Sequence, residues 1–214
     1  MLNKNPLFAI LNRLMNRTQF EQHLRSLPPK AKVLDAGCGT GHNSRYALFL
    51  RPDLKITCLD IDPSYKKVVP GETSFVSGDV NRLKFKNESF DAVLCFHLIE
   101  HLPAPHQAVG EFRRVLKKGG LIFAEAPNWT CTLLPIGTNF WDDPTHLRPH
   151  SKASFAELFK DFSTALLETD EPIMFFIPAL YNIPQGGITN LLRKVMSFFG
   201  LFRIAVFLIA KKTK

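Results

Sequence analysis

The chain has 214 residues, of which 45% are hydrophobic and 21% charged, and these are ordinary values for one globular domain with a full core. Its net charge of +8 is uneven, because six basic residues and no acidic residue follow Glu171, which leaves 21 basic against 19 acidic residues in the body. A nearly neutral body argues against a nucleic-acid partner, and no apolar run reaches transmembrane length because Arg203 interrupts the longest one.

Strand-like and helix-like segments alternate along the chain. We expect one or two amphipathic helices within 6–26, followed by strands at 31–37, 55–62, 73–79, 90–98 and 121–128 and helices at 42–50, 103–120 and 151–162. The remainder predicts a strand near 166–176, an inserted helical segment near 177–200 and a last strand near 203–211. This alternation predicts an α/β domain over 1–214, with a doubly wound, mostly parallel sheet covered by helices on both faces.

In such a sheet, ligands bind at the carboxyl ends of the strands. The first strand ends in VLDAGCGTG, whose glycines Gly37, Gly39 and Gly41 allow a tight turn and close approach of a ligand. A dinucleotide-binding loop would need a third glycine at His42, and a phosphate-binding Walker loop would need Lys at that position. The loop therefore indicates a ligand other than a dinucleotide or a nucleoside triphosphate.

Three acidic residues lie near the ends of the first three strands. Asp35 precedes the glycines and suits a ligand with an ammonium group, whereas it would repel a pyrophosphate. Asp60 lies about 20 residues beyond the glycines, where an acid accepts hydrogen bonds from ribose hydroxyls. Asp79 ends the third strand, where it would meet the exocyclic amine of an adenine. Ammonium, ribose and adenine without phosphate together indicate S-adenosylmethionine (SAM).

The sequence resembles the class I SAM-dependent methyltransferases of the type-11-like group. VLDAGCGTG resembles their first motif, LDIDPS the second, and SGDVNRLKFKNESFDAVLCFHLIEHL and FRRVLKKGGLIFAEAPN the later ones, over roughly residues 30–150. This resemblance implies a Rossmann-like seven-stranded sheet with an antiparallel last strand. It also implies that Gly37 and Gly39 hold the methionine part of SAM, Asp60 the ribose, and Asp79 with Val80 the adenine. The expected cofactor site is completed by Asp35, Gly41, Ile61 and Phe96.

The segment HLIEH, at 97–101, matches a zinc-peptidase signature, H-x-x-E-H. Its place on a strand-to-helix turn of a doubly wound sheet removes the protease interpretation. Two hypotheses stay open. Glu100 and His101 shape the methyl-transfer site without a metal, or His97, Glu100 and His101 hold a divalent ion with His146 as a fourth ligand. Some O-methyltransferases that the chain resembles carry a metal on E-x-x-E-H, in which the first Glu is His97 here.

The segment NFWDDPTHLRPHS, at 139–151, is polar, aromatic and stiffened by two prolines. One hypothesis makes it a substrate lid, in which His146 is a general base and Arg148 grips an anionic group. The other makes it a brace for the helix that follows. A hydroxyl acceptor needs a base with a pKa near neutrality, and our candidates for the catalytic base are His146 and His101.

These features predict a SAM-dependent methyltransferase that acts on a hydroxyl group of a small molecule or glycan. The rival hypotheses are an RNA methyltransferase and a membrane-associated protein that binds SAM without turnover. The basic, apolar segment after Glu171 suits peripheral contact with an anionic membrane, although it also fits a core strand and helix. Asn and Arg residues interrupt the apolar N-terminus, which has no signal-peptide pattern, and the cysteines form no C-x-x-C pair, so we expect a cytoplasmic protein.

Overall fold

The computed structural model describes residues 17–133, 139–169 and 205–213, which contain one seven-stranded sheet. Its strands are β1 (Lys32–Ala36), β2 (Lys55–Asp60), β3 (Ser74–Ser77), β4 (Phe90–Phe96), β5 (Leu116–Pro127), β6 (Ser163–Thr169) and β7 (Ala205–Lys211). Their spatial order is β3-β2-β1-β4-β5-β7-β6. The chain thus starts in the middle of the sheet and builds outward on both sides, as a doubly wound fold does.

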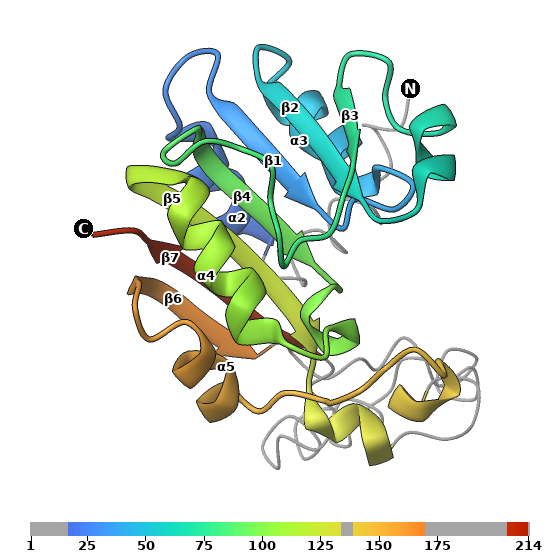
Figure 1. Ribbon diagram of the computed structural model, residues 1–214. Helices are drawn as coiled ribbons and strands as arrows, with labels where there is room; N and C mark the ends of the chain where they lie inside the picture. The colour runs from blue at the N-terminus through green and yellow to red at the C-terminus, as the bar shows by residue number, and fades with distance from the viewer. Residues whose placement is uncertain (1–16, 134–138, 170–204, 214) are drawn as a thin grey trace, which may run out of the picture.

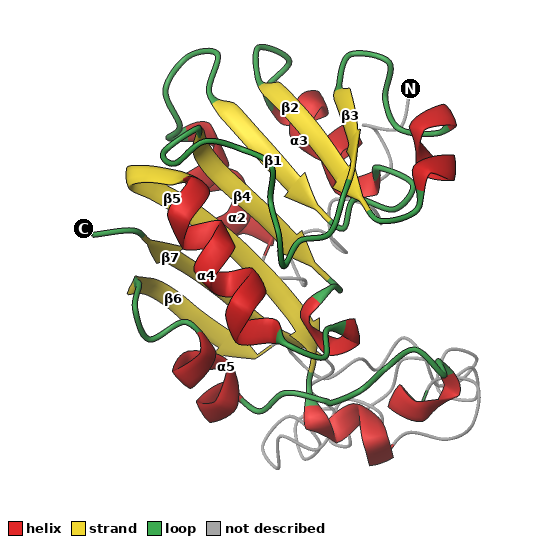
Figure 2. Cartoon of the chain, in the orientation of Figure 1, coloured by secondary structure: helices red, strands yellow, loops and turns green. Residues whose placement is uncertain are grey.

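Strand direction follows the same plan. The pairs β1–β2, β2–β3, β1–β4 and β4–β5 are parallel, whereas β7 is antiparallel to both β5 and β6. The predicted seven-stranded sheet with an antiparallel last strand is therefore confirmed. In Figure 2 the arrowheads of β1, β2 and β4 point toward the side of the molecule that carries the short helices following β5.

Helices cover both faces of the sheet (Figure 1). On one face lie α4 (Pro105–Val115) and α5 (Lys152–Leu158), which bury Phe112 and Phe155 completely. On the other face lie α2 (Arg17–Arg25) and α3 (His42–Leu50), and here Phe20 of α2 packs edge-to-face on Phe123 of β5 with ring centroids 5.1 Å apart. Two apolar layers enclose the sheet, so its strands are nearly continuous buried runs.

The predicted helix at 103–120 is wrong at its C-terminal end. Helix α4 stops at Val115, and Leu116 begins β5 by pairing with Phe90. The backbone of Gly119 and Gly120 then pairs with Lys212, through Gly119 N to Lys212 O at 2.8 Å and Lys212 N to Gly120 O at 3.0 Å. Local sequence favours helix through the lysines, but this pairing with a residue distant in sequence overrides it.

Other boundaries move by a few residues. Helix α5 ends at Leu158 rather than at 162, and β6 begins at Ser163 rather than near 166. Ser151 caps α5, because its side chain accepts a hydrogen bond from the Ser154 N–H. The expected helix before residue 17, the expected continuation of β6 to 176 and the inserted segment near 177–200 lie outside the described residues.

The last described segment belongs to the core. Ala205–Ala210 are all buried in β7, between β5 and β6. Lys212 is also buried, and its Nζ donates a hydrogen bond to the Leu116 carbonyl at 2.7 Å. The core-strand alternative is therefore confirmed for this part of the tail. Among the residues that the structure describes, no helix combines the length and the apolar character that crossing a membrane requires.

We predict that Phe123→Ala lowers the free energy of unfolding by about 3–5 kcal/mol, because it leaves a cavity under α2. The matched control is Phe49→Ala, since Phe49 is 61% exposed on α3 and its loss should cost about 0.5 kcal/mol or less. Urea unfolding of both variants measures the difference. Equal losses of stability would contradict the placement of Phe123 in the core.

Candidate active site at the carboxyl ends of the strands

The glycine loop follows β1 directly and is fixed to the end of β2. The N–H groups of Gly37 and Cys38 both donate to the Leu59 carbonyl, at 2.8 and 3.0 Å. Gly37 has φ +68°, and a Cβ atom there would lie 2.8 Å from Cδ1 of Leu98. Glycine is favoured here, because the backbone is left-handed and a Cβ atom would have to displace the end of the Leu98 side chain.

Gly39 presents an open backbone. Its φ is +48°, and a Cβ atom there would have nothing within 4 Å, so a ligand can approach the loop closely. Its N–H donates to Oδ2 of Asp60 at 2.8 Å, and Oδ1 of Asp60 accepts from the Asp62 N–H at 3.0 Å. A carboxylate offers about four acceptor positions, so Asp60 retains capacity for two hydroxyl donors. The geometry suits a ribose at this point.

Asp79 lies two residues beyond the end of β3, rather than within the strand as expected. Its Oδ1 accepts from the backbone and side chain of Asn81, at 2.8 and 3.1 Å, and within the described chain no hydrogen bond reaches its Oδ2. Val80 is buried next to it, Ile61 is 74% exposed, and a hollow of about 280 Å³ begins at Asp79. An open carboxylate oxygen and an exposed apolar side chain would suit a flat, amine-bearing base, and the adenine site at Asp79 and Val80 stays a prediction.

Asp35 is buried rather than open. Its side chain is 1% exposed, and its Oδ2 accepts from Ser44 Oγ at 2.6 Å. Burial raises the pKa of Asp35 to about 7, although the hydrogen bond from Ser44 partly opposes this. The predicted attraction for an ammonium group therefore comes from a carboxyl that is only partly ionised at neutral pH.

Phe96 ends β4 on the α2 face of the sheet. Its ring packs edge-to-face on Phe20 at 5.6 Å and stacks on Phe207 at 6.3 Å. These contacts account for the ring as part of an aromatic cluster, and its contact with the cofactor stays a prediction.

The HLIEH segment forms a turn rather than a long helix. His97 follows β4 with φ +50°, and Ile99–His101 form a single 3₁₀ turn, η2. His97 Nε2 lies 3.0 Å from Glu125 Oε1, and its Nδ1 lies 3.4 Å from Glu100 Oε1. Burial lowers the pKa of His97, but the two carboxylates outweigh this effect and raise the pKa to about 10. His97 is therefore an imidazolium at neutral pH, with a proton on both nitrogens.

Glu100 is the buried acid of this turn. Its side chain is 0% exposed, and within the described residues neither carboxylate oxygen accepts a hydrogen bond. One donor atom each from Glu100, His101 and His146 lies within 4.8 Å of the others, as a metal site requires. His97 is not part of this group, since its nitrogens contact Glu125 and Glu100 instead. The structure thus supports three residues of the four expected as ligands.

The 139–151 segment packs against this turn, through hydrogen bonds to Glu100 and Pro103. The Leu147 N–H donates to the Glu100 carbonyl at 2.9 Å, and Arg148 Nη2 donates to the Pro103 carbonyl at 3.2 Å. His146 Nδ1 lies 2.6 Å from the Phe140 carbonyl, and its ring stacks on Phe140 with centroids 4.4 Å apart. These contacts place His146 beside His101, with ring centroids 4.7 Å apart.

Two polar residues of this segment, Asp143 and Thr145, were not among the site residues predicted from the sequence. Thr145 Oγ1 lies 2.9 Å from His101 Nδ1, and the same hydroxyl donates to Asp143 Oδ1 at 2.6 Å. The signal in the sequence was Asp143-Pro144-Thr145, since Asp before Pro commonly starts a turn that its own side chain caps. Which histidine it would touch could not be read from spacing.

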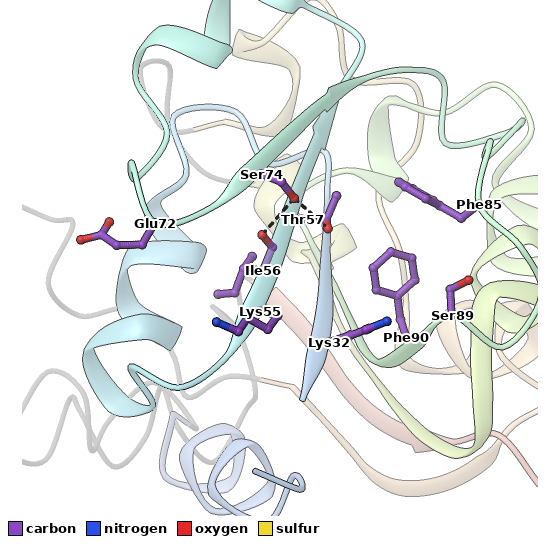
Figure 3. A pocket seen from close by; sticks show the side chains of 9 residues that line it. All are labelled: Lys32, Lys55, Ile56, Thr57, Glu72, Ser74, Phe85, Ser89 and Phe90. Carbon is purple, nitrogen blue, oxygen red and sulfur yellow. Dashed lines mark hydrogen bonds between the residues drawn. The ribbon is translucent and has the colours of Figure 1, made fainter. Parts of the chain in front are cut away.

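A separate hollow of about 390 Å³ lies at the amino-terminal ends of β1, β2 and β3 (Figure 3). In it the hydroxyls of Ser74 and Thr57 are 3.0 Å apart, and the rings of Phe85 and Phe90 form the other side, with Lys32 and Lys55 below. These are the opposite ends of the strands from Asp60 and the glycine loop. This hollow is therefore no part of the candidate active site.

Comparison with known proteins agrees with this geometry. A family model described as a methyltransferase domain matches residues 34–124, from β1 into β5. A ubiquinone biosynthesis O-methyltransferase of Xanthomonas campestris is 31% identical in an alignment 166 residues long, which covers 65% of this chain and 68% of that protein. The thiol S-methyltransferase TMT1B of Rattus norvegicus is 27% identical in an alignment 176 residues long, which covers 72% of this chain and 69% of that protein.

The fold has solved counterparts. A SAM-dependent methyltransferase from Archaeoglobus fulgidus matches with a TM-score of 0.67 and 21% identity, over 97% of this chain and 100% of that one. At this identity the likeness establishes the fold.

We predict that Asp35→Asn changes the pH dependence of stability. The folded chain holds the Asp35 proton up to about pH 7, whereas the unfolded chain releases it near pH 3.8, so the contribution of Asp35 to stability falls as pH rises between these values. Asn keeps an acceptor for the Ser44 hydroxyl but does not titrate, so its contribution to stability does not fall as pH rises. The variant should therefore gain stability relative to the wild type from pH 4 to pH 8, by at most about 4 kcal/mol. Urea unfolding at several pH values measures it, and parallel curves would contradict the raised pKa.

Proposed function

The chain belongs to the class I SAM-dependent methyltransferases, and we propose that it methylates a hydroxyl oxygen of a small molecule or glycan. Its cofactor is SAM, and its enzyme class is established at the level of methyl transfer. The observation that carries the finer proposal is the pair of histidines, His101 and His146, held side by side over the strand ends. Hydroxyl and thiol acceptors differ in how much they depend on a general base, which such a pair can supply.

The open glycine loop would hold the methionine part of SAM, Asp60 its ribose and Asp79 with Val80 its adenine. SAM supplies a methyl group that its sulfonium already activates, so the protein has to position the acceptor and exclude water. Gly39 leaves space at the loop, and the 139–151 segment closes over the turn after β4. The cofactor and acceptor would meet between these two parts.

His146 fits the role of general base. Its Nδ1 lies 2.6 Å from the Phe140 carbonyl, which can only accept, so the proton of the neutral ring lies on Nδ1. Nε2 therefore carries the lone pair that takes a proton. The side chain is 15% exposed, and Asp143 Oδ2 lies 3.8 Å from Nε2, where it stabilises the imidazolium that forms.

A hydroxyl acceptor makes use of such a base. A phenolic hydroxyl has a pKa of about 10, and an alkyl hydroxyl a much higher one, whereas a thiol ionises with a pKa of about 8.5 and depends less on a base. Trp129, on the short helix before the 139–151 segment, and Trp141, on the short helix within it, are 50% and 57% exposed. They offer flat apolar faces to a ring-bearing acceptor. Together these features support a ring-bearing hydroxyl compound.

One observation favours a second candidate mechanism. The buried Glu100 carboxylate accepts no hydrogen bond from the described residues, and its ion-pair contact with His97 Nδ1 is long, at 3.4 Å, so its burial is costly. Glu100, His101 and His146 would hold a divalent ion, with zinc or manganese suited to this mixture of imidazole and carboxylate. Such an ion would orient and acidify the acceptor hydroxyl, and His146 would then be a ligand rather than a base.

We predict that Asp60→Ala weakens SAM binding at least about 100-fold, because two hydrogen bonds to a carboxylate contribute about 3–6 kcal/mol. Isothermal calorimetry with SAM measures the dissociation constant. Asp62→Ala is the matched control, since Asp62 only caps the turn after β2 through the Ser64 N–H, and its affinity should stay near that of the wild type. Retained affinity in Asp60→Ala would overturn the placement of the cofactor.

We predict that His146→Ala lowers kcat for methyl transfer by about 100-fold or more, while calorimetry shows unchanged SAM affinity, because a general base typically contributes this much. The probes are radiolabelled SAM with catechol as the hydroxyl acceptor and dithiothreitol as the thiol acceptor. His106→Ala, an exposed histidine at the start of α4, is the control and should keep full activity.

Transfer to catechol that disappears in His146→Ala supports the proposal, and equal transfer in variant and wild type excludes His146. Faster transfer to the thiol than to catechol contradicts the choice of hydroxyl acceptor. Addition of EDTA separates the two mechanisms. Activity that survives EDTA supports the base, whereas activity that is lost and then restored by Zn²⁺ or Mn²⁺ assigns the three residues to an ion.

A further inference from the structure

His101 is held by a short chain of hydrogen bonds from the 139–151 segment. Thr145 Oγ1 lies 2.9 Å from His101 Nδ1 and 2.6 Å from Asp143 Oδ1, and the Thr145 N–H also donates to Asp143 Oδ1, at 2.8 Å. Thr145 is exposed, so packing of its side chain in the core does not explain this arrangement. Its backbone and hydroxyl converge on one carboxylate oxygen, and the hydroxyl oxygen faces the histidine.

The direction of each bond follows from the available protons. A carboxylate only accepts, and a hydroxyl has one proton. The Thr145 hydroxyl gives that proton to Asp143, so toward His101 its oxygen can only accept. His101 must then donate from Nδ1. In the neutral ring this leaves Nε2 without a proton, as a lone pair directed away from Thr145.

Asp143 is suited to keep this direction fixed. The two hydrogen bonds from Thr145, the one from its hydroxyl being the stronger effect, lower the pKa of Asp143 below its ordinary value. His146 and His101 lie close enough to lower it further by their positive charge when they are protonated. The carboxyl therefore stays ionised at neutral pH. It has no proton to donate, so it cannot reverse the direction of the hydrogen bonds through Thr145.

The lone pair of His101 Nε2 faces functional groups. Nε2 lies 4.0 Å from the buried Glu100 Oε1, and the ring lies against that of His146. His146 has the same arrangement by other means, since the Phe140 carbonyl fixes the proton on its Nδ1. Both neutral histidines thus carry a bare Nε2, and the proton on Nδ1 is held by a backbone carbonyl in His146 and by a side-chain hydroxyl in His101.

We propose that Thr145, anchored by Asp143, is a positioning residue that fixes the Nδ1–H tautomer of His101 and keeps its Nε2 bare in the active site. This inference rests on the proposed function, in which a bare imidazole nitrogen serves as base or ligand at the acceptor hydroxyl. Groups that orient a histidine in this way commonly change activity by 10- to 100-fold (about 1.4–2.7 kcal/mol) when they are lost. No role in binding SAM follows for Thr145.

The test compares Thr145→Val with Thr145→Ser in the full-length protein. Valine keeps the branched shape but removes the hydroxyl, whereas serine keeps the hydroxyl. Nitrogen-15 NMR of histidine-labelled protein with S-adenosylhomocysteine distinguishes the two tautomers directly. We expect the Nδ1–H form for His101 in the wild type and in Thr145→Ser. In Thr145→Val we expect the Nε2–H form to appear, with kcat for catechol reduced about tenfold and the KM for SAM within twofold.

Each result of these measurements either supports or overturns the proposed role of Thr145. An Nε2–H form in the wild type, or an unchanged spectrum in Thr145→Val, overturns the proposal. A changed spectrum with unchanged kcat also overturns it, since the tautomer would then not matter for turnover. If the wild type leaves catechol unmethylated, the spectra alone decide. Full activity of His101→Ala with the expected spectra would instead remove the catalytic role of His101, a failure of the proposed function that the spectra separate from a failure of the orienting chain.

Discussion

The parallel pairing of β1 with β2 and β4 is the constraint on which the site depends. It brings the ends of these three strands to one edge, where the glycine loop, Asp60 and the turn after β4 lie together. Leu98 of that turn packs against Gly37, and the Gly39 N–H binds Asp60, so the three strand ends also fix one another. A change in register would separate these contacts at once.

Two carboxyls at this edge are buried, and each has few hydrogen bonds within the described residues. Asp35 has one hydrogen bond from Ser44 and a raised pKa, and Glu100 has no hydrogen bond among the described residues. Burying such groups is unfavourable, and proteins commonly keep such unfavourable features at functional sites. The arrangement is understandable if both act on what binds there, Asp35 through its charge near the cofactor and Glu100 through the two histidines.

The sequence predicts the sheet well, because strands follow from local patterns, whereas the cofactor residues stay a prediction that the shared edge of the sheet supports. The ends of β1, β2 and β3 could be located from apolar runs. Because these strands are parallel, the acidic residues that follow them were expected at one edge of the sheet. The helix at 103–120 was too long because Lys212, almost a hundred residues away, pairs with Gly120. The Thr145–His101 contact was missed for the same reason, since it joins two loops 44 residues apart. Long-range pairing of short polar segments leaves no periodic signal.

A crystal structure with S-adenosylhomocysteine would show whether the carboxyl-terminal edge of the sheet is a methyl-transfer site. We predict the ribose hydroxyls on Asp60, the adenine beside Asp79 and Ile61, and the sulfur facing the space in front of His101 and His146. A ligand bound elsewhere, for example in the hollow at the amino-terminal ends of the strands, would contradict it. So would a bound ligand whose sulfur faces away from both histidines.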